Sequence, residues 1–225
     1  MPARFTPLVQ GEIYHVFNRG IDRRPTFTDK REKQRAMEVI SFYRFAHLPV
    51  RLSRFLVLAS ERQIETTQAL LESHNNLVDI LAFCIMPNHF HFLLKQISPN
   101  GISKFMANFQ NSYTRYFNIK HARVGALFLT QFKAVRIEDD EQLLHTCRYI
   151  HLNPSTSYVV KDYISLRNYQ WSSLPEYLED ISNQRICSKE IILSHFKTKK
   201  AFEQFHNDQV GYQRSLHAIK HLIFE

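Results

Sequence analysis

Two histidines one residue apart interrupt an apolar run in the middle of the chain, CIMPNHFHFLL, which covers residues 84–94. Alternate side chains of a β-strand point to the same face, so we expect His89 and His91 to share one face of a strand. Phe90 and Phe92 then point into a core on the other face. Imidazole is the commonest metal ligand among side chains. The pattern therefore predicts a pair of metal ligands on a rigid strand, and the alternative is a half-buried strand whose polar face carries histidine.

A second set of polar side chains recurs at four-residue steps further along the chain: His145, Tyr149 and Asn153. This spacing places the three on one face of a helix, for which a plain polar surface is the alternative interpretation. If that face lies over His89 and His91, two imidazoles and the Asn153 oxygen would hold a divalent cation with positions open for substrate. Tyr149 would then attack what the metal polarises, because a phenol with a pKa of about 10 is a feasible nucleophile and leaving group.

Charge is unevenly distributed along this basic chain of 225 residues, whose formal net charge is +8. No acidic residue occurs between Asp79 and Glu138, the interval that contains the histidine pair. This distribution predicts a positive potential around the histidines and favours binding to a polyanion. The candidate DNA contacts are the basic residues of the interval: Lys95, Lys104, Arg115, Lys120, Arg123, Lys133 and Arg136.

Several protein classes lack support in the sequence. The three cysteines, Cys84, Cys147 and Cys187, are scattered and form no CxxC pair, so they predict small buried side chains and neither a disulfide framework nor a cysteine zinc site. There is no Walker-type loop, no HExxH and no GxSxG motif, which leaves NTPases, zincins and α/β-hydrolases without support. No apolar stretch resembles a membrane span or a signal peptide, so we expect a soluble cytoplasmic protein.

Hydrophobic periodicity predicts the elements that position these residues. We expect strands at 12–20, 77–86, 89–96 and 125–137, and helices at 28–47, 102–121, 138–154, near 188–206 and near 210–223. Residues 48–76 are ambiguous, because 53–60 fits a strand or a helical stretch. Thr28 is expected to cap the first helix and Pro154 to end the helix of Tyr149. The order of elements predicts an α+β fold, an antiparallel sheet with helices packed on one face.

Four motifs occur in the order MPNHFHFLL, YTRYFNIKHARVGALFLTQFKA, RYIHLNP and YQWSS. Together they resemble the single-tyrosine HUH transposases of insertion sequences, and most closely the REP-associated tyrosine transposases. The resemblance covers roughly residues 10–178. It implies a ferredoxin-like (RRM-like) catalytic domain over residues 1–154, followed by a mostly helical C-terminal extension, 155–225, packed on it.

The resemblance also implies an activity and its residues. His89, His91 and Asn153 would bind Mg²⁺ or Mn²⁺, and Tyr149 would form a 5′-phosphotyrosine link with single-stranded DNA, usually beside a hairpin. The implied protein nicks and rejoins DNA as a monomer or homodimer, and is cytoplasmic and nucleoid-associated in a bacterium, with no membrane partner. The alternatives are a catalytically inactive or domesticated module that binds hairpin nucleic acid, and a replication-initiator or relaxase-type HUH endonuclease.

Other tyrosines and histidines compete for these roles. Tyr113 and Tyr116 are rival nucleophiles, but Tyr113 continues an apolar stripe with Phe105 and Phe109, so packing is the preferred interpretation. Further candidates for ligands or DNA contacts are His15, His121, His145 and His151. For each of these histidines alone, an ordinary surface or core position is preferred.

Overall fold

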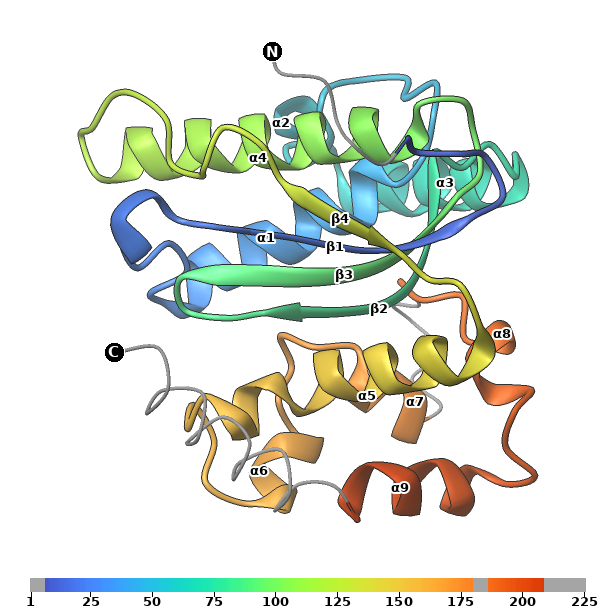
Figure 1. Ribbon diagram of the computed structural model, residues 1–225. Helices are drawn as coiled ribbons and strands as arrows, with labels where there is room; N and C mark the ends of the chain where they lie inside the picture. The colour runs from blue at the N-terminus through green and yellow to red at the C-terminus, as the bar shows by residue number, and fades with distance from the viewer. Residues whose placement is uncertain (1–6, 180–185, 209–225) are drawn as a thin grey trace.

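Four antiparallel strands form the centre of the computed structural model, which describes residues 7–179 and 186–208 (Figure 1). They are β1 (Ile13–Arg19), β2 (Val78–Ile85), β3 (His89–Gln96) and β4 (Lys133–Arg136). Their order across the sheet is β2-β3-β1-β4, so the first strand of the chain, β1, lies between β3 and β4. With one helix after β1 and another after β3, this is the ferredoxin-like α+β topology that the sequence predicts.

Helices lie on both faces of the sheet. On one face are α1 (Lys30–Tyr43) and α4 (Gly101–Lys120), and on the other is α5 (Asp140–Thr156) (Figure 1). The expectation of helices on a single face therefore holds for α1 and α4 but not for α5, whose buried side chains pack against β2 and β3. The remaining helical segments are η1 (Ile21–Arg23), α2 (Leu52–Phe55), α3 (Ser60–Glu72), α6 (Tyr163–Arg167), α7 (Leu174–Leu178), α8 (Glu190–Leu193) and α9 (Lys199–Asn207).

Strand alternation in β3 sorts its side chains between the two helical layers. Phe90 and Phe92 are fully buried on the side of α4, where the Phe90 ring lies 4.9 Å from that of Phe109. Burying one such side chain stabilises the fold by roughly 1.5–3 kcal/mol, which strongly favours this register over a one-residue slip. His89 and His91 consequently face α5.

The predicted roles of Thr28 as a helix cap and of Pro154 as a helix end are wrong, and α1 also ends at Tyr43, before the predicted residue 47. Asp29 caps α1, accepting from the Glu32 backbone N–H at 2.9 Å, whereas the Thr28 hydroxyl donates to the Glu32 carboxylate at 2.7 Å. Pro154 does not end α5, which continues to Thr156. A proline this close to a helix end removes only one hydrogen bond, and the Pro154 carbonyl still accepts from the N–H groups of Val159 and Val160.

The last strand is much shorter than predicted. Of residues 125–137, only Lys133–Arg136 pairs continuously with β1, while Phe128 forms a single bridge with Gly20. The strand expected there is interrupted because β1 ends at Arg19 and the chain turns into η1. Phe128 instead fills the core beside Phe90, with ring centroids 5.5 Å apart. The ambiguous residues 48–76 contain the helices α2 and α3.

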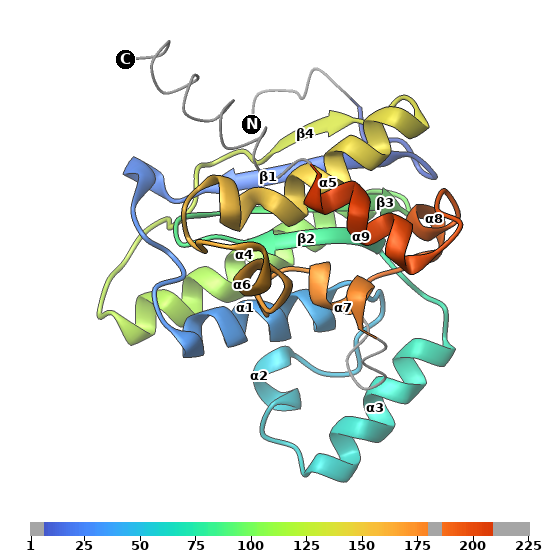
Figure 2. The same ribbon diagram turned by 90° about the horizontal axis from the view of Figure 1, so that it is seen from below.

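The segment after α5 covers the outer edge of the sheet at β2. The Ile85 N–H donates to the Trp171 carbonyl at 2.8 Å, the Phe83 N–H donates to the Ser173 hydroxyl at 2.9 Å, and the Tyr177 hydroxyl donates to the Leu81 carbonyl at 2.6 Å. These bonds satisfy an edge that would otherwise be open to pairing with another chain. Figure 2 shows this C-terminal layer together with α5 on one side of the sheet.

The C-terminal helices differ in extent from those predicted. The helix expected near 188–206 is divided into α8 and α9, and the one expected near 210–223 lies outside the described residues. None of the helices within 7–179 and 186–208 combines the length and apolar character that crossing a membrane requires.

Candidate active site

The histidines of β3 and the polar face of α5 meet on the α5 side of the sheet. The rings of His89 and His91 lie 5.1 Å apart and are perpendicular. The Nε2 atom of His89 is 3.3 Å from Oδ1 of Asn153, which is almost completely buried. Strand alternation and helix periodicity thus bring together the three side chains that were predicted as metal ligands.

Tyr149 lies one helical turn before Asn153, beside the same histidines. Its ring meets that of His91 edge-on, with centroids 5.4 Å apart, and 40% of the residue surface is exposed. Partial burial raises the pKa of the Tyr149 hydroxyl, although the neighbouring Asn153 side chain acts in the opposite direction. The phenol is therefore protonated at neutral pH, while its exposed surface leaves it accessible to a large substrate.

Burial also sets the protonation state of the two histidines. It lowers the pKa of His89, and it lowers the pKa of His91 well below the usual value, with the neighbouring His15 and His89 adding to the effect. Both rings are therefore neutral at pH 7. A neutral imidazole offers the lone pair that a metal ion requires.

The spacing of these donors fits a hard divalent cation. Two ligand atoms at right angles, each about 2.1 Å from a shared octahedral ion, lie about 3 Å apart. The 3.3 Å between His89 Nε2 and Asn153 Oδ1 is close to this value. Imidazole nitrogen and amide oxygen are both acceptable ligands for Mn²⁺, and the oxygen also suits Mg²⁺. The residues present therefore fit the ions that the sequence implied.

A third histidine, His15 of β1, joins this group. Its Nε2 atom lies 2.9 Å from Nδ1 of His91, and its ring is 5.9 Å from that of Tyr149. Burial lowers the pKa of His15 to about 4, so it too is neutral at pH 7. If His91 donates from Nδ1 to His15, the Nε2 lone pair of His91 is left for a metal, an outer-sphere arrangement common among ligating histidines.

Sequence reasoning undervalued His15. Alternation within β1 already placed it on the opposite face from Tyr14 and Val16. The missing information was the pairing of β1 with β3, in which Phe17 lies opposite His91 and His15 opposite Leu93. That register depends on contacts between segments more than 70 residues apart.

The competing tyrosines lie elsewhere. Tyr113 is fully buried in α4 on the far face of the sheet, where its hydroxyl donates to the Thr26 carbonyl at 2.5 Å and burial raises its pKa. Tyr116 belongs to the same helix, and the Arg35 guanidinium lies 4.9 Å from its ring centroid. Both positions agree with packing as their main role.

The three other candidate histidines lie away from the pair on β3. His121 donates to Glu32 at 2.6 Å on the α1–α4 side, and His151 is buried beside His206. His145, predicted to share a face with Tyr149, contacts Arg148 at 2.8 Å instead.

The predicted DNA-contacting residues are distributed over more than one surface. Lys133 lies opposite Phe17, which in turn lies opposite His91, so these three side chains cross the sheet on the histidine face. Lys95 is on the same face of β3. Arg136 points to the other face and pairs with Glu12 at 2.9 Å, while Lys120 pairs with Asp29 and Glu32. Lys104 is exposed on α4.

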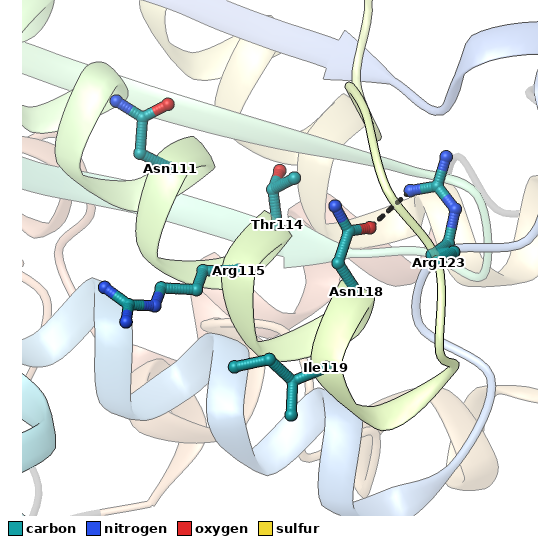
Figure 3. Close-up of a pocket in the computed structure, with 6 residues that line it drawn as sticks. All are labelled: Asn111, Thr114, Arg115, Asn118, Ile119 and Arg123. Atoms are coloured by element: carbon teal, nitrogen blue, oxygen red, sulfur yellow. Dashed lines mark hydrogen bonds between the residues drawn. The ribbon is translucent and has the colours of Figure 1, made fainter.

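Arg115 and Arg123 line an open depression of about 530 Å³ along α4 (Figure 3). The helix α4 lies on the other face of the sheet from α5, which the histidines face (Figure 1). Arg123 donates to the Asn118 side chain at 2.6 Å. The depression is completed by Asn111, Thr114 and Ile119. Its polar side chains and two guanidinium groups are suited to phosphate, but it is separate from Tyr149.

Comparisons with known proteins agree with the motifs. Residues 50–153 match the family model described as IS200-like transposase, a range that includes both β3 histidines, Tyr149 and Asn153. A solved structure of the REP-associated tyrosine transposase bound to a REP hairpin is similar in fold, with a TM-score of 0.53 and 13% sequence identity. The alignment covers 79% of this chain and 86% of that one. No curated protein matches the sequence significantly.

Proposed function

We propose that this chain, a member of the IS200-like transposase family, nicks and rejoins single-stranded DNA beside hairpins through a 5′-phosphotyrosine on Tyr149. The observation that carries the proposal is the position of Tyr149 and Asn153 directly over His89 and His91. A nucleophile, neutral metal ligands and a partly open surface occur together there. The hairpin is proposed as substrate because the protein of similar fold is bound to one.

Each residue has a distinct part in the proposed reaction. His89, His91 and Asn153 would hold Mg²⁺ or Mn²⁺, which when bound supplies Lewis-acid polarisation of the scissile phosphate. The Tyr149 oxygen attacks phosphorus and loses its proton, the new O–P bond forms, and the bond from phosphorus to the 3′ oxygen breaks. That oxygen leaves as a 3′-hydroxyl after taking up a proton. Attack by another 3′-hydroxyl on the phosphotyrosine reverses these steps and joins the strands.

The basic residues on the histidine face would guide the strand to Tyr149. Lys133 on β4 lies in line with Phe17 and His91, so a phosphate that it contacts would be near the nucleophile. Arg115 and Arg123 would contact a more distant part of the nucleic acid. We further propose that residues 1–154 form the catalytic unit and that the segment from 155 onward supports it, because described residues of that segment, Trp171 and Ser173, bond to β2.

A relaxase-type endonuclease is the second candidate, because such enzymes often use a third clustered histidine and His15 lies beside His91. The 2.9 Å contact from His15 to the ring of His91 supports a role in orienting a ligand. We therefore favour the transposase assignment, in which His15 is a positioning residue.

The test is denaturing electrophoresis of a labelled single-stranded hairpin incubated with the protein and Mn²⁺. Wild type should give a nicked product and a covalent protein–DNA adduct, whereas Tyr149→Phe should bind the hairpin and give no adduct. Tyr116→Phe, which removes the same atom from another partly exposed tyrosine, is the matched control and should retain the adduct. Hairpin binding without cleavage by wild type would favour the inactive binding module instead.

A further inference from the structure

The opposite side of α5 carries a cluster of side chains of the types that ligate metals. Cys147 and His151 lie one turn apart on α5, and His206 approaches them from α9. All three are buried, and one ligand atom from each lies within 4.8 Å of those of the others. Cys147 lies two residues before Tyr149, and His151 lies two residues before Asn153. Two residues turn a helix by about 200°, so the cluster and the candidate active site lie on different sides of α5.

In His151 and His206, one ring nitrogen bonds to a group outside the cluster, and the other ring nitrogen faces the cluster. Nδ1 of His206 donates to the Phe202 carbonyl at 2.9 Å, so Nε2 of the neutral ring carries a lone pair. That atom faces Nδ1 of His151 at 3.0 Å, and Nε2 of His151 lies 2.7 Å from the Ser173 hydroxyl. Metal-ligating histidines are usually held by such bonds from the nitrogen that does not bind the ion.

We propose that Cys147 Sγ, His151 Nδ1 and His206 Nε2 form a binding site for a thiophilic d¹⁰ cation, Zn²⁺ or Cu⁺. The sulfur is 3.8 Å from His151 Nδ1, a separation that a shared ion can bridge with little movement. A thiolate with two imidazoles selects these ions over Mg²⁺ and Mn²⁺. The absence of a CxxC pair concealed the site in the sequence, because its ligands come from two helices 55 residues apart.

Binding requires proton transfers that the surroundings can accommodate. Burial raises the pKa of the Cys147 thiol, so an entering ion displaces its proton to solvent. The His151 proton then resides on Nε2 and is donated to Ser173. The shell is otherwise apolar and aromatic, with the Phe202 ring 4.3 Å from that of His206 and 5.0 Å from that of Tyr177.

The site would fasten α9 to the helix that carries Tyr149. Its ligands join Cys147 and His151 of α5 to His206, which adds bonds through the ion to the hydrogen bonds that already link α5 and α9 at His151–His206 and Arg148–Phe205. The two candidate ions differ in charge, since Cu⁺ with one thiolate is neutral and Zn²⁺ with one thiolate is positive. Arg148, which donates to the Phe205 carbonyl at 3.2 Å, places a further positive charge nearby.

The experiment uses the full chain with His89→Ala and His91→Ala, so that the candidate active site contributes no metal binding and the outcome is independent of the proposed nuclease activity. After chelation, the protein is titrated with Zn²⁺ or, under reducing conditions, Cu⁺. One equivalent of one ion should bind. At about a hundred times Kd it should raise Tm by roughly 5–10 °C. Co²⁺ should give a thiolate-to-cobalt charge-transfer band.

Cys147→Ser should abolish the Tm shift and the cobalt band, whereas Cys84→Ser, which alters another buried thiol on β2, should retain both. The ion that binds more tightly, Zn²⁺ or Cu⁺, is the one that the site takes, and tight binding of either ion supports the proposed site. Failure of both ions to bind, or equal binding by the two serine variants, would overturn it in favour of a hydrogen-bonded histidine pair. If Cys147→Ser does not fold, the cobalt band of the parent protein and its loss in His206→Gln decide the question.

Discussion

At the scale of single residues, the chemistry of the candidate site depends on where protons reside. The Tyr149 phenol has a raised pKa because burial disfavours its anion, while the histidines beneath it are neutral because burial disfavours their cations. The site therefore presents ready ligands and a nucleophile that must lose a proton during attack.

Cleavage through Tyr149 should accelerate with rising pH. Below the pKa of a phenol the phenolate fraction grows tenfold per pH unit, and burial raises the pKa of Tyr149 above its ordinary value. Single-turnover adduct formation at saturating Mn²⁺ between pH 6 and 9 should increase throughout the range. A rate that is constant or falls over this range would mean that loss of the Tyr149 proton does not limit the step.

His15 should affect metal binding more than the chemical step, because it contacts His91 and not the proposed ion. Removing the outer partner of a ligating histidine typically lowers metal affinity 10–100-fold. His15→Ala should therefore weaken Mn²⁺ binding by about that factor, measured by titration, with much of the cleavage rate recovered at high Mn²⁺. His145→Ala, a histidine of α5 that faces Arg148, should bind Mn²⁺ like wild type. Unchanged Mn²⁺ affinity in His15→Ala would refute the positioning role.

At the scale of elements, a buried carboxylate connects the two helices on the far face. Glu32 of α1 is fully buried and accepts from Lys120 at 2.7 Å and His121 at 2.6 Å, at the end of α4. It also accepts from the Thr28 N–H at 2.6 Å. Desolvation alone would raise the pKa of Glu32, but these bonds outweigh it and lower the pKa to about 2.

Glu32→Gln should lower the free energy of unfolding by about 2–3 kcal/mol at pH 7, since it weakens hydrogen bonds to charged groups. The folded pKa is depressed, so the carboxylate's contribution is complete above the unfolded value of 4.5 and declines as pH falls towards 2. Urea unfolding should accordingly show the gap between wild type and variant narrowing from pH 5 to pH 2.5. Glu65→Gln, which alters an exposed partner of Arg62, is the control and should change the free energy of unfolding little. A gap that is constant with pH would exclude the linkage.

The sequence predicts those elements whose residue pattern is local, and it fails where an element depends on distant parts of the chain. The histidine strand and the helix of Tyr149 were predictable because each carries its own period of two or about four residues. The short β4 was not, because its length depends on where β1 turns away. The predicted cap of α1 is one residue from the observed one, since Thr28 and Asp29 are both good capping residues and their types alone do not decide between them. The cluster of His206 with Cys147 depends on how α9 docks.

At the scale of the whole molecule, positive charge is divided between a histidine face and the α4 face. The ion pairs of Arg136 and Lys120 reduce the charge available to DNA, so the acid-free interval contributes less than its composition indicates. Lys133, on the histidine face, remains the best placed cation for a strand that reaches Tyr149.

Hairpin affinity should fall with salt by roughly 0.7 log units per log unit of salt for each single-strand phosphate contacted. Lys133→Ala should reduce this slope by about that amount. Arg136→Ala is the matched control, since this residue of the same strand points to the other face and pairs with Glu12. The measurement is fluorescence anisotropy of a labelled hairpin at several salt concentrations. Equal reductions in the two variants would show that the histidine face is not the DNA path.

Both sides of α5 carry proposed functional residues, and this limits the insertions and deletions that the helix can tolerate. One face of the helix meets the β3 histidines through Tyr149 and Asn153, and the other meets α9 through Cys147 and His151. A single inserted or deleted codon between 147 and 153 would rotate everything after it by about 100°, turning Asn153 away from His89. A point substitution on α5 alters one side of the helix at a time. An insertion or deletion within α5 alters both sides together, so we expect variation in chain length to accumulate in the loops around this helix.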